Sequence, residues 1–161
     1  MLNPDGGIET DLTVVCIDKD HFRIISSAAT RERDKFHINK HLAKDVELKD
    51  VTDDYCVFGV FGPKSRALMK SISKDNFEND NFRFSTAKYI TIEGIKIWTQ
   101  RLSYVGELGY ELYVKSEDAK KIYELLVNKG KDFNLSNCGM HAMDIMRMES
   151  GFLHWGHDIL S

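Results

Sequence analysis

Two segments of this chain place carboxylate side chains where they can do chemistry. Residues 101–114 read R-L-S-Y-V-G-E-L-G-Y-E-L-Y-V and put Glu107 and Glu111 among glycines and tyrosines. Asp11 follows a Gly-Gly pair, which allows a tight turn that leads into a strand. A carboxylate can accept hydrogen bonds from a ligand or stabilise positive charge. The same residues also fit ordinary turns and a strand, so both interpretations stay open at this point.

A third segment, residues 139–159, combines a helical pattern with charged, aromatic and histidine side chains. Asp144 and Arg147 are three residues apart and therefore lie on one helix face. Such a pair contributes little when it is exposed. The segment accordingly fits either a ligand site or a capped helix with a surface ion pair.

Metal and nucleophile chemistry find little support. His37 and His41 are four residues apart on an expected helix, but no glutamate follows the first histidine and no third ligand is near. His154 and His157 flank Trp155, a cluster that fits ligand binding or packing. No serine lies in a G-x-S-x-G context. We expect no metal, and a solvated helix face at the first histidine pair.

The three cysteines, Cys16, Cys56 and Cys138, are far apart and odd in number. A disulfide framework is therefore not expected, and the three thiols are predicted to be reduced and buried.

Short β-branched or alternating runs predict strands over residues 12–17, 22–26, 46–48, 55–61, 89–92, 95–99 and 110–114. The 55–61 run is nearly all apolar, which predicts burial on both faces. Glu93-Gly94 predicts a tight hairpin turn. Helices are predicted over residues 28–42 with Ser27 as the cap, after Gly62-Pro63, after a cap at Ser116, and over residues 139–149. Interspersed strands and helices give the class α+β, with mixed or antiparallel sheets.

Composition excludes several classes of protein. The 161 residues carry 22 Lys plus Arg against 25 Asp plus Glu, without a dominant basic tract. A general nucleic-acid surface needs clustered positive charge, so that role is not expected. No apolar run approaches the roughly 20 residues of a membrane helix, and the first residues lack the order of a secretory signal.

Four motifs occur in an order that resembles the aminomethyltransferase family, which includes the glycine-cleavage T-protein. They are N-x-x-G-G-I-E-T-D-L-T-V, F-G-P-K-S-R-A-L, Y-V-G-E-L-G-Y-E-L-Y and D-I-M-R-M-E-S-G-F followed by W-G-H-D. The T-D-L-T-V and G-E-L-G wording is most similar to the folate-binding halves of sarcosine and dimethylglycine dehydrogenases. The resemblance covers essentially the whole chain, residues 1–161.

The resemblance implies tetrahydrofolate as cofactor and a small-molecule one-carbon donor of the aminomethyl or N-methyl type. The pterin edge offers adjacent N–H donors, which a carboxylate accepts as a bidentate pair. Glu107 matches the family's Y-x-G-E motif and is assigned that role, with turn capping as the alternative. Tyr104 is expected beside the ring or in the core.

Two further residues take roles from the same resemblance. Asp11 matches the acidic residue after the Gly-Gly turn, which lies near the reacting folate nitrogens and would orient the amine or stabilise a cationic carbon. The T-protein form has two consecutive acids there, whereas this chain has Thr10-Asp11. Arg147 matches the R-x-E motif and would bind a carboxylate or pair with Asp144 or Glu149.

The resemblance also predicts what surrounds the chain. Family members begin before the Asn3 motif and continue after Asp158 into a β-barrel, so residues 1–161 are expected to be a partial folate-binding domain, inactive alone, whose partners include those segments. The FAD domain of the sarcosine-type enzymes is missing, so oxidation is not expected. Exposed apolar surface would favour a homo-oligomer. The expected compartment is the cytoplasm, or the mitochondrial matrix in a eukaryote.

Two other functions fit the same fold. One is a regulatory or binding module without turnover, and the other is a demethylase whose methyl donor is not an amine, such as a sulfonium compound. Folate binding without turnover in the longer protein would favour the module.

Overall fold

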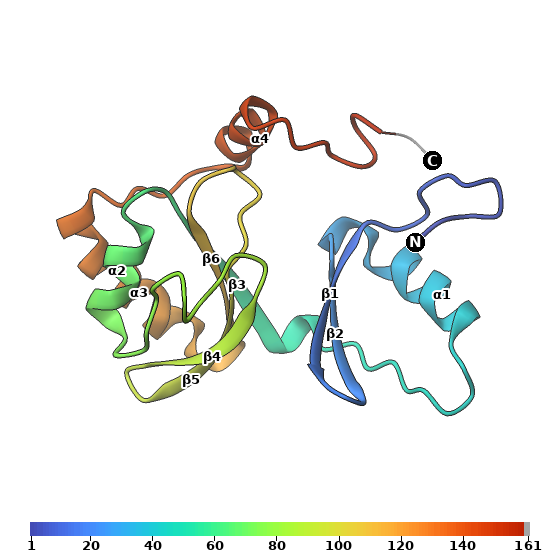
Figure 1. Ribbon diagram of the computed structural model, residues 1–161, viewed down its shortest axis with the longest axis horizontal. Coiled ribbons are helices and arrows are strands. Elements are labelled where there is room, and N and C mark those ends of the chain that lie inside the picture. Colours follow the sequence, from blue (N-terminus) through green and yellow to red (C-terminus); the bar gives the residue numbers. More distant parts are fainter. Residues whose placement is uncertain (160–161) are drawn as a thin grey trace. The chain divides into compact units, whose positions relative to one another are not determined.

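The computed structural model describes residues 1–159, which form two compact units (Figure 1). The first, the hairpin unit, holds residues 1–50 and the chain from Leu153 onward. The second, the sheet unit, is Val51–Phe152. Each unit contains helices and antiparallel strands, so the α+β class is confirmed.

Strands β1 (Leu12–Asp18) and β2 (His21–Ser26) form the hairpin that gives the first unit its name. They pair antiparallel, with Val14 opposite Ile24. Both predicted strands are confirmed. They form because two β-branched runs flank a polar turn that can reverse the chain.

Helix α1 (Arg31–His41) follows the 3₁₀ turn η1 (Ala28–Thr30). The Ser27 hydroxyl accepts a hydrogen bond from the Ala29 N–H at 3.3 Å, so Ser27 caps η1, and the α-helix itself begins three residues later than predicted, at Arg31. The strand predicted over residues 46–48 is wrong. That segment contains no strand, because three apolar-biased residues have no neighbouring strand to pair with.

The sheet unit is built on four antiparallel strands in the order β3-β6-β5-β4. Their bounds are β3 (Tyr55–Phe61), β4 (Ala87–Ile92), β5 (Ile95–Gln100) and β6 (Gly109–Lys115). The predicted Glu93-Gly94 turn is confirmed, since both residues have positive φ, 51° and 78°. This is the backbone of a type I′ turn, whose twist matches that of the strands it joins.

Helices α2 (Ser65–Ile72) and α3 (Ala119–Gly130) lie on one side of this sheet (Figure 1). Leu68 and Met69 of α2 and Ile122 and Leu126 of α3 pack with strand residues in one apolar core. The strand and loop members of that core are Val60, Phe77, Phe82, Ile90, Ile92, Ile97, Tyr110, Leu112 and Val114. Burial of this apolar surface is the main force that holds the unit together.

Three sequence expectations about the sheet unit need correction. Strand β3 is not buried on both faces, because Val57 is 52% exposed. Helix α2 begins at Ser65, two residues after the proline. Ser116 opens the 3₁₀ turn η3 (Ser116–Asp118), and its hydroxyl donates to the Asp53 carbonyl at 2.9 Å instead of capping a helix.

Helix α4 (Met140–Glu149) confirms the last predicted helix. The short 3₁₀ turns η2 (Thr52–Asp54) and η4 (Lys131–Phe133) complete the sheet unit. The three cysteines are free, as expected, but Cys16 and Cys138 are exposed, so the prediction of buried thiols is wrong for them. No helix within residues 1–159 is long and apolar enough to cross a membrane.

Candidate functional site

The loop between β5 and β6 carries two of the predicted site residues and rests against the end of α4 (Figure 1). The Ser150 hydroxyl donates to the Val105 carbonyl at 3.0 Å. Gly106 has φ +76°, and a Cβ there would collide with the Ser150 side chain. The Tyr104 ring stacks on Phe152, with centroids 6.3 Å apart and planes 14° apart. The loop is therefore held at three consecutive residues by the chain that follows α4.

Arg147 holds that supporting segment in place. Its side chain is only 4% exposed, and its Nε donates to Asp144 Oδ1 at 2.7 Å. Its Nη1 donates to the Phe152 carbonyl at 3.0 Å, across the turn that ends α4. Charge-assisted bonds of this kind are stronger than neutral ones. The ion pair of Arg147 with Asp144, considered from the sequence, is present. Arg147 and Tyr104 both contact Phe152, Arg147 at its carbonyl and Tyr104 at its ring.

Glu107 lies in the turn of the same loop, with its side chain exposed. Within the described residues it has no hydrogen bond or ion pair, so it does not cap the turn. Two hydrogen bonds from the start of the segment after β3 hold the backbone of this turn. The Leu108 carbonyl accepts from the Gly62 N–H at 2.8 Å and from the Ser65 hydroxyl at 3.0 Å. The loop thus presents the Glu107 carboxylate on a well-supported backbone.

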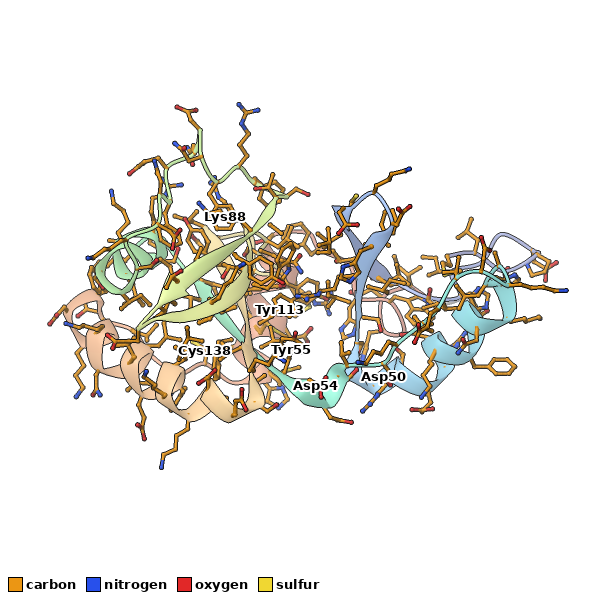
Figure 2. The ribbon with its side chains drawn as sticks, turned by 90° about the horizontal axis from the view of Figure 1, so that it is seen from below. Asp50, Asp54, Tyr55, Lys88, Tyr113 and Cys138 are labelled. Atoms are coloured by element: carbon orange, nitrogen blue, oxygen red, sulfur yellow. The ribbon has the colours of Figure 1, made fainter. Side chains whose placement is uncertain are left out.

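Strand β6 presents a second carboxylate, Glu111, that the sequence analysis noted without assigning. Tyr110, Leu112 and Val114 face the apolar core, so Glu111 and Tyr113 alternate onto the opposite face. The hydroxyl of Tyr113, which is labelled in Figure 2, donates to Glu111 Oε2 at 2.8 Å. Residues directly opposite share a face, so Gln100 of β5 and Gly59 of β3 flank Glu111. This side of the sheet is called the Glu111 face.

The Phe61 ring covers two glycines on the same face of the sheet. Phe61 of β3 is opposite Gly109 of β6, and it shares the Glu111 face with Gly59. A Cβ at Gly59 would lie 2.5 Å from the Phe61 ring, and a Cβ at Gly109 would also meet that ring. Both positions require glycine because the ring occupies the space above them. The result is an aromatic surface next to a hydrogen-bonded carboxylate.

The signal for Glu111 was present in the sequence as strict alternation along residues 110–114. What the sequence lacked was the register that sets Gln100 and Gly59 opposite it, because those residues are 11 and 52 positions away.

Asp11 lies in the hairpin unit, immediately before β1, with an exposed side chain. Its backbone environment is ordered by its neighbours. The N-terminal amine donates to the Thr10 carbonyl at 2.7 Å, and Glu9 pairs with Arg33 at 3.0 Å. The Gly-Gly turn before it is closed by the Asn3 side chain, whose Oδ1 accepts from the Gly7 N–H at 2.8 Å. Asp11 thus lies at the open end of the hairpin, next to the Leu12–Ser26 pair.

Two other features of the structure bear on chemistry. Among residues 1–159 no three His, Cys, Asp or Glu side chains gather as a metal site, and the His37 and His41 rings pair with each other, centroids 4.8 Å apart. Burial lowers the pKa of Lys88, whose ammonium lies 4.6 Å from the centre of the Phe82 ring; Asp75 partly offsets this shift. Lys88 extends from β4 (Figure 2), an edge strand that β5 separates from the Glu111 strand β6.

Comparison with known proteins identifies the family. The model of the GCVT N-terminal domain matches residues 1–161. The chain belongs to this family. The expected resemblance to aminomethyltransferases and to dimethylglycine dehydrogenase is thereby confirmed.

Relatives of this GCVT domain include a dehydrogenase, an oxidase and an aminomethyltransferase. Human mitochondrial dimethylglycine dehydrogenase is 33% identical over 97% of this chain and 18% of that protein. The 4-methylaminobutanoate oxidase (formaldehyde-forming) of Paenarthrobacter nicotinovorans is 35% identical over 98% of this chain and 19% of that protein. The aminomethyltransferase of Halothermothrix orenii is 31% identical over 99% and 44%. The chain therefore spans less than half the length of these relatives.

A solved structure shares the fold. Heterotetrameric sarcosine oxidase from Corynebacterium sp. U-96 matches with a TM-score of 0.63 and 13% sequence identity. The match covers 83% of this chain and 66% of that chain.

Proposed function

We propose that this GCVT domain is the folate-binding part of an enzyme that transfers a one-carbon unit from an aminomethyl or N-methyl donor. Tetrahydrofolate, when bound, supplies the nitrogens that take up that unit. The relatives named above include an aminomethyltransferase and two enzymes named for N-methylated amines, which supports this class of donor. The activity as a whole belongs to a protein of the relatives' greater length.

The Glu111 face carries the proposal. The flat edge of a pterin has an N–H and an amino group side by side, and a carboxylate accepts both in one bidentate pair. Glu111 is half-buried, and its Oε2 is already oriented by the Tyr113 hydroxyl. The Phe61 ring beside it gives an aromatic bicycle a surface to pack on, which favours a planar ligand over an aliphatic one.

Two carboxylates now compete for the pterin edge. Glu107 is the residue assigned from the sequence motif, and it is exposed on a supported loop. Glu111 is oriented by a hydrogen bond and lies next to a ring surface. A partly desolvated, pre-positioned acceptor binds a neutral donor pair more strongly than an exposed one, because the exposed carboxylate must first lose its water. We therefore assign the edge to Glu111 and keep Glu107 for contacts at the solvent side.

Tyr104 and Arg147 have supporting roles in this proposal. Tyr104 stacks on Phe152, and this contact fixes the plane of its ring in the loop that carries Glu107. Arg147 fixes the Phe152 carbonyl and so determines where Tyr104 stands.

Asp11 is proposed to stabilise positive charge that develops on the transferred carbon. A carboxylate used in that way acts on the reacting atoms and not on the pterin edge. Its loss should therefore lower turnover of the longer enzyme and leave folate affinity within about twofold, since an exposed carboxylate that makes no ground-state contact contributes little to binding.

The test is calorimetric titration of the chain with 5-formyltetrahydrofolate, a stable reduced folate, for the wild type, Glu111→Gln, Glu107→Gln and Asp11→Asn. Glu117→Gln is the matched control, because Glu117 is an exposed glutamate of η3 at the opposite end of β6. We expect Glu111→Gln to weaken binding by roughly tenfold to a hundredfold, the loss of a charge-assisted pair.

The remaining variants separate the assignments. Glu107→Gln should weaken binding less than Glu111→Gln, while Asp11→Asn and Glu117→Gln should bind as the wild type does. A large loss for Glu107→Gln with none for Glu111→Gln would return the pterin edge to the loop carboxylate. A folded wild-type chain that gives no saturable binding would contradict the proposed function.

A further inference from the structure

A cavity of about 340 Å³ opens in the sheet unit between the end of β3, the start of α2 and residues 133–138. Its apolar walls are Val60, Pro63, Leu68, Phe133 and Leu135. None of the described residues that line it belongs to the β5–β6 loop or to β6, the segments that carry the proposed pterin contacts. The volume of this cavity is in the range of those that hold small molecules.

The wall formed by residues 133–138 is held firmly against α3. The Leu135 N–H donates to the Gly130 carbonyl at 2.9 Å, and a Cβ at Gly130 would collide with the Leu135 side chain. The Asn137 amide donates to the Tyr123 hydroxyl at 2.7 Å. The cavity is therefore bounded by a supported backbone on both sides of Ser136.

Cys138, which is labelled in Figure 2, brings a thiol to this wall. Its side chain is exposed, and the thiol donates to the Ser136 carbonyl at 3.8 Å. Of the other two cysteines, Cys16 is exposed on β1 and Cys56 is half-buried in β3, and neither lines the cavity. Cys138 is thus the cysteine that both solvent and a ligand in the cavity can reach.

The charge at the cavity favours an anion. Lys64 lines it, and none of the described lining residues is an Asp or a Glu. Lys64 is also the N-cap of α2, and Gly139, which follows Cys138, is the N-cap of α4. Neither helix has a side-chain cap or an acidic residue in its first turn, so the partial positive charge of both N-termini is uncompensated. The cavity therefore fits a ligand with a carboxylate and an apolar body.

Reactive cysteines lie in surroundings of this kind, partly exposed and electropositive. We propose that Cys138 forms mixed disulfides with small disulfides that carry a carboxylate and an apolar body, which the cavity holds beside the thiol. The Cys138 thiol gives its proton to solvent, and its sulfur attacks one sulfur of the ligand. The S–S bond of the ligand breaks, a new S–S bond forms, and the other half of the ligand leaves as a thiolate. The inference does not depend on the proposed function.

The experiment compares two aromatic disulfide reagents, 5,5′-dithiobis(2-nitrobenzoate), which carries carboxylates, and 4,4′-dithiodipyridine, which is neutral. Each reacts with a chain that keeps one exposed thiol: Cys138 in Cys16→Ser/Cys56→Ala, and Cys16 in Cys56→Ala/Cys138→Ser. Cys16 is the matched control, because it is exposed and its thiol also donates to a carbonyl, that of Asp18 at 3.3 Å. The ratio of the two rate constants removes the intrinsic reactivity of each thiol. Circular dichroism verifies that each variant is folded.

The ratio should favour the anionic reagent at Cys138 over Cys16 by about tenfold or more. Lys64→Gln should lower the ratio at Cys138 by about threefold, whereas Lys121→Gln, an exposed lysine of α3 that does not line the cavity, should leave it unchanged. The anion 2-nitrobenzoate, which has no disulfide, should slow the labelling of Cys138 competitively and leave that of Cys16 unchanged.

Equal ratios at the two thiols, or labelling of Cys138 that 2-nitrobenzoate does not slow, would overturn the inference. Peptide mapping of the wild-type chain after limiting 5,5′-dithiobis(2-nitrobenzoate) gives a measurement that needs no variant. The label should appear at Cys138 first, and earlier labelling of Cys16 would also overturn the inference.

Discussion

Gly106→Ala tests whether the β5–β6 loop is truly supported by the end of α4. Gly106 has φ +76°, and a Cβ there would collide with the Ser150 side chain. Gly94 is the matched control, because its φ is +78° and nothing lies within 4 Å of the position of its Cβ. Both substitutions therefore place an alanine in the left-handed region, but only one of them also meets a neighbour.

The magnitude follows from the two contributions. The left-handed conformation costs each alanine about 1–2 kcal/mol. Forcing a side chain into an occupied space costs Gly106→Ala a further ~1–3 kcal/mol. The free energy of unfolding should thus fall for both variants, and by about 1–3 kcal/mol more for Gly106→Ala than for Gly94→Ala.

The assay is urea denaturation followed by tryptophan fluorescence in a Trp155→Phe background. The chain has two tryptophans, so Trp98 then reports on the sheet unit alone. Gly106→Ala should also weaken binding of 5-formyltetrahydrofolate, because Tyr104 and Glu107 share the displaced loop. Equal destabilisation by Gly106→Ala and Gly94→Ala would refute the contact between the loop and Ser150 on which this part of the site depends.

Three further outcomes are expected. Arg147→Met should lower the free energy of unfolding of the sheet unit by about 1–3 kcal/mol, through loss of the bond to the Phe152 carbonyl; the exposed i,i+4 pair removed by Lys120→Met should cost under about 1 kcal/mol in the same urea titration. Burial lowers the pKa of Lys88, so its charged form is disfavoured in the folded state, and stability should rise with pH between the lowered value and the ordinary lysine pKa. That rise should be missing from the pH series of Lys88→Met, and its persistence would contradict the cause given. Val14 and Phe22 expose apolar surface on β1 and β2, so sedimentation velocity should show self-association as the concentration increases, and a monomer at all concentrations would contradict it.

Local signals in the sequence predicted most of the secondary structure. The Glu93-Gly94 turn specifies its hairpin, because a type I′ turn requires positive φ at both residues and glycine supplies one of them without strain. Ser27 specifies the start of the 3₁₀ turn η1, which leads directly into α1, through its own hydrogen bond. In both cases the deciding interaction lies within a few residues.

The errors come from interactions that are distant in sequence. The apolar run of β3 suggested burial on both faces, but Val57 turns to the face of the sheet opposite the apolar core. Ser116 is a good cap by type, yet its hydroxyl bonds the Asp53 carbonyl, 63 residues away. Residues 46–48 have strand-forming side chains and no strand to pair with.

The candidate site shows the same division. Glu107 and Asp11 could be proposed from the sequence because they lie in short motifs. The pairing of Glu111 with Gln100 could not, because it depends on the register of β5 against β6. The two glycines beneath the Phe61 ring come from different strands, and their common function appears only when those strands are paired.

Calorimetric titration of the wild-type chain with 5-formyltetrahydrofolate tests most directly whether the Glu111 face binds a reduced folate. Near-UV circular dichroism of the same sample verifies that the tyrosine and tryptophan side chains are packed. We predict saturable binding with one site per chain. Absence of binding by a chain with a native near-UV spectrum would contradict the account, and would mean that the Glu111 face does not form a pterin site within residues 1–161.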